Sequence, residues 1–410
     1  MIHFLRLTFF WFLLAGSGAQ AQTLPDTTRP AQLDLSDLGQ RWFHVKLVPG
    51  ADSLHPDKPQ WAVLPSLNYS PATGVAVGGI LTTAFYPKHT PHTRLSTGQL
   101  YVGYSQYNQT FVSALSNIWT REHRFNIQGD YRFHNFPTTT FGLGSNTQLA
   151  NVSAIDYNHI RFYQTIYAAV GRDYMLGAGY LLDHHFSITN VAPDGQPTDF
   201  DRYGRTAQST SSGVAVGLLR DRRGNPNNPT GGSYLLVQYR YFAKALGGSS
   251  NWQAIWFDYR RYVSLGGRLE KQMAFWSFNW ATFGGRVPYL DLPATGWDSF
   301  GNTGRGYTLG RFRGPTFFYA EAEYRTQLTA NGLFGAVLFA NAQTVHNWLG
   351  SNTLLPIDSS VQGCLVKVWP GFGGGIRVKV NKNARTNLAI DYGLGAGGSS
   401  GLYFNLNEVF

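Results

Sequence analysis

The chain has 410 residues, of which 15% are aromatic and only 14% charged, and its formal net charge is +10. The single cysteine, Cys364, excludes an internal disulfide framework. After the N-terminal segment no run approaches the roughly 20 uninterrupted apolar residues that a membrane helix requires. With 47 Gly and 23 Tyr and little helical periodicity, the chain is predicted to be a soluble all-β protein or a transmembrane β-barrel.

The N-terminus carries Arg6, an apolar run from Leu7 to Ala15, and small residues up to Ala21. This layout predicts a secretory signal peptide at residues 1–21. Residues 22–60 contain Pro, Asp and Thr without sustained periodicity and are predicted to form a short periplasmic lead-in, which is too short for a domain of ordinary size. Residues 61–410 are predicted to form one barrel domain.

Side chains in the predicted strands alternate with period two, which separates lipid-facing and lumenal faces. The apolar faces predicted for two strands are Leu235, Val237, Tyr239 and Tyr241 in one, and Ala274, Trp276, Phe278 and Trp280 in the other. Large aromatics recurring in strand after strand favour a lipid-facing wall over a soluble core. Trp119, Tyr262 and Trp280 lie at strand ends, where aromatic girdles at the membrane interface are expected.

The alternation predicts about 16 strands in a closed antiparallel transmembrane barrel, because lipid offers no hydrogen-bond partner to an open edge. The predicted strands begin near residues 61, 74, 94, 107, 122, 158, 171, 209, 233, 250, 270, 316, 332, 369, 386 and 401. Their connections alternate between short and long, and short turns are expected on the periplasmic side.

Three short segments carry distinctive patterns. Pro65 to Gly79 reads as a hairpin with Tyr69, Pro71, Thr73 and Gly74 at its turn, and a second turn has Asp221, Arg223, Pro229 and Gly232. The loop from Gly304 to Gly314 contains Arg305, Gly306, Tyr307, Arg311, Phe312 and Arg313. Glycine allows close backbone approach and arginine offers five donors in a planar fork, so this loop is predicted to dock against something.

The last ten residues, Gly401 to Phe410, place Leu402, Phe404, Leu406 and Phe410 on one predicted face. This ending resembles the C-terminal recognition signal of bacterial outer-membrane barrels. Together with the two turns and the Arg305-Gly306-Tyr307 motif, it resembles the BamA/TamA (bacterial surface antigen) superfamily of outer-membrane assembly barrels over nearly all of residues 61–410.

The resemblance implies that the loop between predicted strands 11 and 12 folds into the lumen, where Arg305 pairs with Glu323. In the next strand Asn341 stands where the family usually has Asp, so we expect a second acidic partner of Arg305 to be missing and the loop lock to be looser. Family members usually carry periplasmic POTRA domains as well, and residues 22–60 cannot hold one.

Three functions remain open. The chain could aid insertion or translocation of protein or lipid at the bacterial outer membrane, through a weak seam between its first and last strands. It could be a passive pore constricted by the Arg-rich loop, or the membrane half of a complex with a separate periplasmic subunit. The expected partners are outer-membrane lipid and either that subunit or an unfolded client protein.

Other classes of function are not expected. His184 and His185 are adjacent in a strand and point to opposite faces, so no metal site is predicted. No nucleophile, base and metal set converges, so neither enzymatic activity nor a cofactor is predicted. The basic residues are scattered and form no run, so nucleic acid is not an expected partner.

Overall fold

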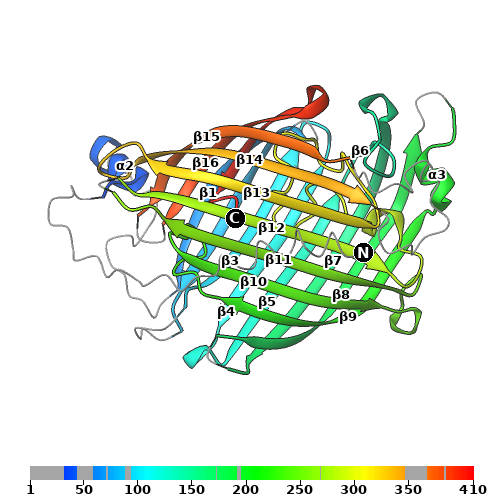
Figure 1. The fold of residues 1–410 in the computed structure, drawn as a ribbon, viewed down its shortest axis with the longest axis horizontal. Coiled ribbons are helices and arrows are strands. Elements are labelled where there is room, and N and C mark those ends of the chain that lie inside the picture. The colour runs from blue at the N-terminus through cyan, green and yellow to red at the C-terminus, as the bar shows by residue number, and fades with distance from the viewer. Residues whose placement is uncertain are drawn as a thin grey trace. The chain divides into compact units, whose positions relative to one another are not determined.

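The computed structural model describes residues 32–43, 59–70, 73–87, 94–171, 173–191, 195–267, 269–346, 367–382 and 385–410. The predicted signal peptide, residues 1–21, and most of the predicted lead-in lie outside the described residues. The described part is a single antiparallel sheet of 17 strands with few helices (Figure 1). None of its helices has the length and apolar character needed to cross a membrane.

The strands are β1 (Gln60–Ser70), β2 (Gly74–Phe85), β3 (Ser96–Ser105), β4 (Thr110–Trp119), β5 (Phe125–Asn135), β6 (Thr138–Thr140), β7 (Ser153–Ala169), β8 (Met175–Val191), β9 (Gln208–Asp221), β10 (Gly232–Phe242), β11 (Trp252–Ser264), β12 (Lys271–Phe283), β13 (Thr316–Gln327), β14 (Phe334–His346), β15 (Trp369–Asn381), β16 (Thr386–Gly395) and β17 (Ser400–Leu406). The helices are α2 (Leu35–Phe43) and α3 (Asp199–Gly204). Short 3-10 turns are η2 (Arg121–His123), η3 (Leu149–Asn151), η4 (Lys244–Leu246), η5 (Tyr289–Asp291) and η7 (Ala396–Gly398).

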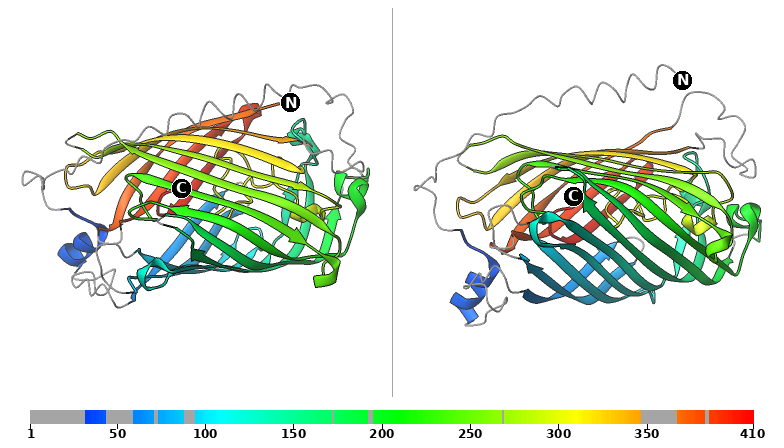
Figure 2. Two further views of the ribbon diagram at one scale, coloured as in Figure 1. Left: turned by 60° about the horizontal axis from the view of Figure 1, so that its bottom comes forward. Right: turned by 90° about the horizontal axis from the view of Figure 1, so that it is seen from below.

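Consecutive strands pair in antiparallel fashion around the sheet, with one local interruption. Both β5 and the three-residue β6 pair with β7, along different parts of it, so together they occupy one position in the sheet. The sheet therefore has one strand position fewer than its 17 strands, which confirms the predicted architecture of about 16 antiparallel strands. The sheet curves round until β17 lies next to β1 (Figure 2).

The alternation along β10 and β11 matches the prediction. Tyr239 and Tyr241 are exposed on the outer face of β10, whereas Gln238 and Arg240 are buried on the inner face. On β11, Asp258 and its neighbours of the same parity are likewise buried inside. Long polar side chains therefore line the lumen on these two strands, together with inward aromatic rings such as Trp252 and Trp256, while Tyr239 and Tyr241 face outward.

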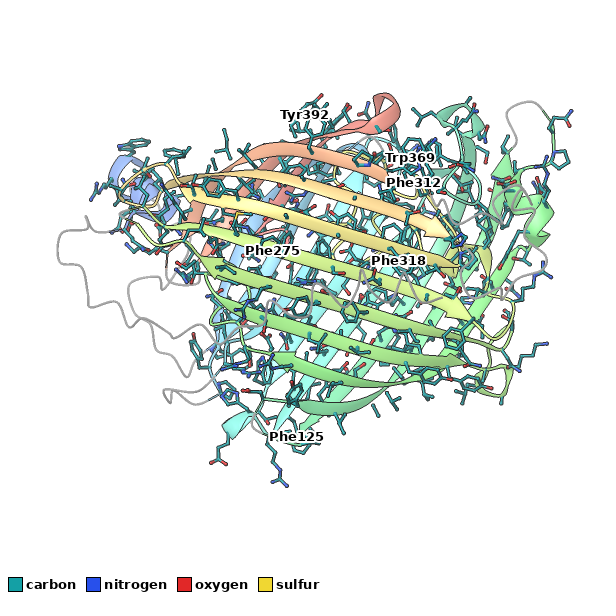
Figure 3. The ribbon with its side chains drawn as sticks, viewed as in Figure 1. Phe125, Phe275, Phe312, Phe318, Trp369 and Tyr392 are labelled. Carbon is teal, nitrogen blue, oxygen red and sulfur yellow. The ribbon has the colours of Figure 1, made fainter. Side chains whose placement is uncertain are left out.

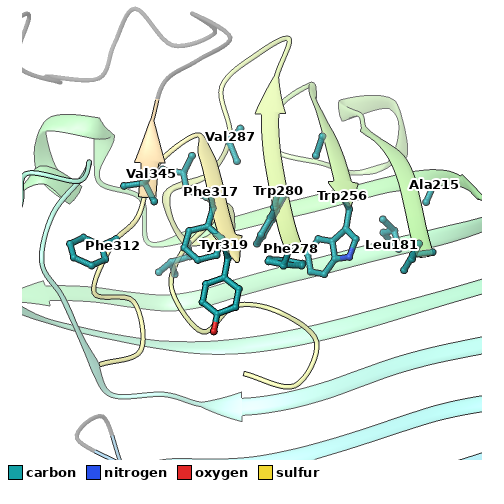
Figure 4. Packing of buried hydrophobic residues seen from close by; sticks show 14 of the residues in the cluster. Leu181, Ala215, Trp256, Phe278, Trp280, Val287, Phe312, Phe317, Tyr319 and Val345 are labelled. Carbon is teal, nitrogen blue, oxygen red and sulfur yellow. The ribbon is translucent and has the colours of Figure 1, made fainter. Parts of the chain in front are cut away.

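The face predicted for β12 is wrong. Trp276, Phe278 and Trp280 point inward and are buried, and Trp276 donates its indole N–H to Asp258 Oδ1 at 2.9 Å. Inside the lumen these rings pack in one apolar cluster with loop residues such as Val287 and Phe312 (Figure 4). A lumen filled by its own loop needs an apolar inner wall, so an aromatic face did not identify the lipid side.

The two remaining predicted girdle residues, Trp119 and Tyr262, are also buried, at 3% and 1% exposure. The Tyr262 ring lies beside Phe410, with 6.4 Å between ring centroids, and the Arg94 guanidinium stacks 4.4 Å from the Trp119 ring centroid. Neither ring serves as an interface anchor here.

Helix α2 occupies part of the segment in which no periodicity was found. Asp34 and Asp37 form a capping box at its N-terminus. Each carboxylate accepts a hydrogen bond from the other residue's backbone N–H, at 3.0 and 2.8 Å. The helix docks on a short turn of the barrel through Lys382, whose Nζ lies 2.8 Å from Asp37 Oδ1. Partial burial opposes ionisation of Asp37, but the bonds from Lys382 and Asp34 outweigh it and lower its pKa.

Candidate functional site

The long connection between β12 and β13, residues 284–315, forms the centre of the candidate site. Its apolar residues Val287, Leu290, Leu292 and Phe312 are buried among the inward rings of the barrel wall. Phe312 packs against Trp369 of β15 in a tilted arrangement, with 4.9 Å between ring centroids (Figure 3). The loop therefore lies inside the lumen.

Arg305 is the most enclosed charge of this loop, with 1% of its surface exposed. Its Nη2 contacts both Glu321 and Glu323 of β13, and its Nη1 donates to Asp391 Oδ2 of β16 at 2.7 Å. The Phe339 ring lies under the guanidinium, 3.7 Å from its centroid. The structure thus places Arg305 against Glu323, together with two further carboxylates.

The expectation that Arg305 lacks a second acidic partner is wrong. Glu321 lies two residues before Glu323 and so shares its inward face, and Asp391 reaches the same point from β16. Asn341 also belongs to the site: its Nδ2 donates a hydrogen bond to the backbone carbonyl of Arg305 at 2.9 Å. The amide holds the loop backbone while other strands supply the charge.

The ion pairs continue beyond Arg305 into a buried network. Arg325 lies 2.5 Å from Glu323 and 3.8 Å from Glu408, while Arg377 lies 2.6 Å from Asp391 and 2.8 Å from Glu408. Three arginines and four carboxylates therefore share contacts in a space from which water is largely excluded. In such a network each charge depends on its partners, because an unpaired buried ion is costly.

The end of the chain joins this network, and Phe410 does not lie where it was predicted. Tyr403 points into the lumen, so Leu402, Phe404 and Leu406 take the opposite face of β17. After the strand, Asn407 adopts a φ of 75°, and the next residues turn inward. Phe410 is 3% exposed and its ring lies 5.2 Å from that of Trp276. The pattern of alternation fails here because the strand ends at Leu406.

Gly306 and Tyr307 fix the loop against the last strands. The Gly306 N–H donates to Tyr403 Oη at 2.8 Å, and Gly306 has a φ of 104°, which favours glycine. The Tyr307 hydroxyl accepts from the Ala396 N–H at 2.9 Å and donates to the Pro370 carbonyl. The arginine, glycine and aromatic residues of the motif therefore each make a separate contact.

Gly393 of β16 provides a test of this close approach. A Cβ at Gly393 would lie 2.6 Å from the Gly306 nitrogen, so Gly393→Ala should push the loop away and destabilise the barrel by about 1–3 kcal/mol. Urea unfolding followed by tryptophan fluorescence measures this. Gly79→Ala is the matched strand control, because no heavy atom lies within 4 Å of its Cβ position. Equal midpoints for both variants would contradict the packing described.

Arg311 and Arg313, the other two arginines between Gly304 and Gly314, are buried, and neither forms an ion pair with a carboxylate of the described residues. Arg311 donates to Thr147 Oγ1 at 2.7 Å and to the Thr147 carbonyl at 2.6 Å, which ties this loop to the connection between β6 and β7. Arg313 donates to the carbonyls of Tyr289, Leu290 and Leu292 at 3.1 to 3.4 Å. Both side chains organise loop backbone.

The predicted turn residues lie away from the loop, between β9 and β10. Arg223 and Asp221 form a two-point pair, with Nε–Oδ1 at 3.0 Å and Nη2–Oδ2 at 2.8 Å. Pro229 is buried, and Gly232 has a φ of 91°. In the first hairpin Ser70 pairs with Gly74, while residue 71 lies outside the described residues.

Sequence reasoning missed Glu321, Asp391 and Glu408 as members of the site. Glu321 had a usable signal, since it stands two residues from Glu323 in a strand. Asp391 is the only charged residue of β16, in which most of the other residues are apolar or glycine, and this marks it as lumenal. Glu408 had no such signal, because its place depends on a turn after β17.

Comparison with known protein families identifies this architecture. The model of the Omp85 superfamily domain matches residues 96–410. The chain belongs to the Omp85 superfamily. This family comprises barrels of outer-membrane insertion and translocation, so the chain is an outer-membrane β-barrel, as its sequence predicted. No curated protein matches the chain.

Solved structures show the same fold. BamA from Haemophilus ducreyi lacking POTRA domains 1–3 aligns with a TM-score of 0.53 at 14% identity, covering 85% of this chain and 70% of that one. CdiB from Acinetobacter baumannii aligns with a TM-score of 0.50 at 11% identity, covering 85% of this chain and 65% of that one. At these identities the likeness to both structures concerns the fold alone.

Proposed function

We propose that this barrel aids the insertion or translocation of protein, or of lipid, at the outer membrane. Membership of the Omp85 superfamily supports the class of function. The buried contacts of Arg305 support a role for the loop as a lock that closes the lumen. In this proposal Arg305, Gly306, Tyr307, Arg311, Arg313, Glu323 and Asn341 hold the lock, with Glu321 and Asp391 as further partners.

The observation that carries the proposal is the seam between β1 and β17. β17 has seven residues, and it pairs with β16 from Ser400 to Leu406. β1 pairs with β2 along its whole length. Although β17 lies beside β1, no ladder joins the two strands among the residues the structure describes. Because unpaired backbone groups are costly in lipid, this edge favours pairing with another strand.

A disulfide across the seam tests the proposal. The background is Cys364→Ser, which removes the native cysteine. In it, one cysteine would replace Trp61 or Val63 of β1, and a second would replace Leu402 or Phe404 of β17. The locked barrel should fail to restore the outer-membrane proteome of a deletion strain, as quantified by mass spectrometry. Reducing agent should restore it. Full activity of the oxidised, fully cross-linked barrel would rule out lateral opening at this seam.

The surroundings of the barrel fit this role. We propose outer-membrane lipid as its environment and, at the end with short turns, an unfolded client or a periplasmic subunit as its partner. Helix α2 offers a surface at that end, where Trp42 is 69% exposed.

We also propose residues 22–60 as a periplasmic lead-in, residues 61–410 as the barrel, and a function without enzymatic chemistry. A lumen occupied by its loop argues against a permanently open pore.

A further inference from the structure

A repeated triplet of acid, tyrosine and arginine lines the inner wall. It occurs at residues 130–132, 258–260 and 323–325. The acid and the arginine share the inner face and pair directly: Arg132 Nε lies 2.6 Å from Asp130 Oδ1, Arg260 Nη2 lies 2.7 Å from Asp258 Oδ2, and Arg325 Nε lies 2.6 Å from Glu323 Oε2. Each of these inward-facing arginines therefore brings its own counter-charge.

Residues 238–240 repeat the triplet with an amide in place of the acid. Gln238 Oε1 accepts hydrogen bonds from Arg240 Nε at 3.1 Å and from Nη2 at 2.7 Å. Arg240 is 6% exposed, and it forms no ion pair with any of the described residues. Burying a guanidinium without a counter-ion is unfavourable, so a partner that compensates the charge of Arg240 is expected.

The neighbours of Arg240 hold its side chain without neutralising it. Gln238 Nε2 donates to the Tyr167 hydroxyl at 2.6 Å, which orients the amide oxygen toward the guanidinium. The guanidinium lies 4.1 Å from the Trp256 ring centroid. Three carboxylates lie nearby, and each has another partner: Asp183 accepts from Arg161 at 2.8 Å, Asp258 accepts from Arg260, and Asp291 accepts from the Ser211 hydroxyl at 2.6 Å. None of them is in ion-pair contact with Arg240.

Arg240 lines a cavity of about 510 Å³ within the described part of the chain. Loop residues Ser299, Phe300 and Asn302 border the cavity, and so do Thr386 and Asn407 from the end of the barrel with short turns. Gln238 and Trp256 also line it. A polar molecule entering from the short-turn end could thus reach the guanidinium.

We propose that Arg240 is an anion-binding subsite of this cavity, which takes a phosphate or carboxylate group. The guanidinium offers a planar fork that matches the oxygens of either group. Gln238 and Trp256 position the fork, and the cavity holds the rest of the ligand. This inference goes beyond the proposed function, because it needs neither an open seam nor a translocated client.

Isothermal titration of the purified full-length barrel in dodecyl maltoside micelles tests the site with three probes: inorganic pyrophosphate, succinate and short-chain dihexanoyl phosphatidic acid. Wild type should bind at least one probe saturably. Arg240→Gln should weaken that binding by at least tenfold, because it removes a charge-assisted hydrogen bond to the anion. Tighter binding of the phosphatidic acid would identify a lipid source, and tighter binding of pyrophosphate or succinate a soluble one.

Arg222→Gln is the matched control, because it removes the same charge from an exposed position in the turn after β9, where Arg222 lies 3.8 Å from Asp173. It should bind as wild type does. Arg240→Lys keeps the charge without the fork and serves if Arg240→Gln fails the heat-modifiability test for folded barrels; it too should bind more weakly. The proposal is overturned if wild type binds none of the probes, or if the folded Arg240 variants bind with wild-type affinity.

Discussion

Arg305→Ala should open the lumen and destabilise the barrel, the largest effect expected of any single substitution in the loop. It removes the shared partner of Glu321, Glu323 and Asp391, all of them buried. Breaking a buried ion pair by removing one partner costs about 3–5 kcal/mol. Repulsion among the three carboxylates then favours release of the loop.

Conductance in planar bilayers measures the opening, and the urea midpoint measures the stability. Wild type should be mostly closed, and Arg305→Ala should conduct. Arg305→Lys should fall between them, because one ammonium cannot reproduce the contacts of a fork. Arg222→Ala, at an exposed position, should behave as wild type. Steady large openings in wild type that persist unchanged in Arg305→Ala would show that the loop is no lock.

Glu408→Ala should release the inward-turned end of the chain and loosen the seam. Glu408 lies 2.8 Å from Arg377 and accepts a hydrogen bond from Asn387 Nδ2 at 2.8 Å. Without it, Arg377 and Arg325 each lose a carboxylate, and we expect a loss of stability of about 3 kcal/mol or more. Phe410 would lose its anchored position beside Trp276.

The readouts are the urea midpoint and hydrogen exchange of the peptides that cover β1 and β17, which should exchange faster. Glu270→Ala is the control, since Glu270 is 38% exposed and pairs with Arg385 at 3.8 Å at the same end of the barrel. A surface pair of this kind contributes at most about 1 kcal/mol. If the two variants are equally stable, the buried network does not hold the end of the chain.

The strand layout could be predicted because period-two alternation and turn residues are local signals. Each predicted strand begins within a few residues of an observed one, and the long loop falls between the expected strands. The inner face of β12 could not be predicted in this way. Its aromatic residues look the same whether they face lipid or a loop inside the lumen, and only the position of residues 284–315 decides between the two.

The candidate site was partly predictable for the same reason. The contact between Arg305 and Glu323 was expected from the resemblance to a family, and Glu321 could have been added from strand parity. The contributions of Asp391 and Glu408 depend on how strands far apart in the sequence meet across the lumen. No local pattern in the sequence carries that information.

The central claim is that the seam beside β1 is the route for clients, and site-specific photo-crosslinking in native membranes tests it most directly. A photoreactive residue would replace Val63 of β1, which is 70% exposed, or Val216 of β9 on a distant part of the wall, which is 55% exposed. Our account predicts adducts with newly made outer-membrane components at position 63 and none at position 216. The same adducts at both positions, or none at position 63, would contradict it.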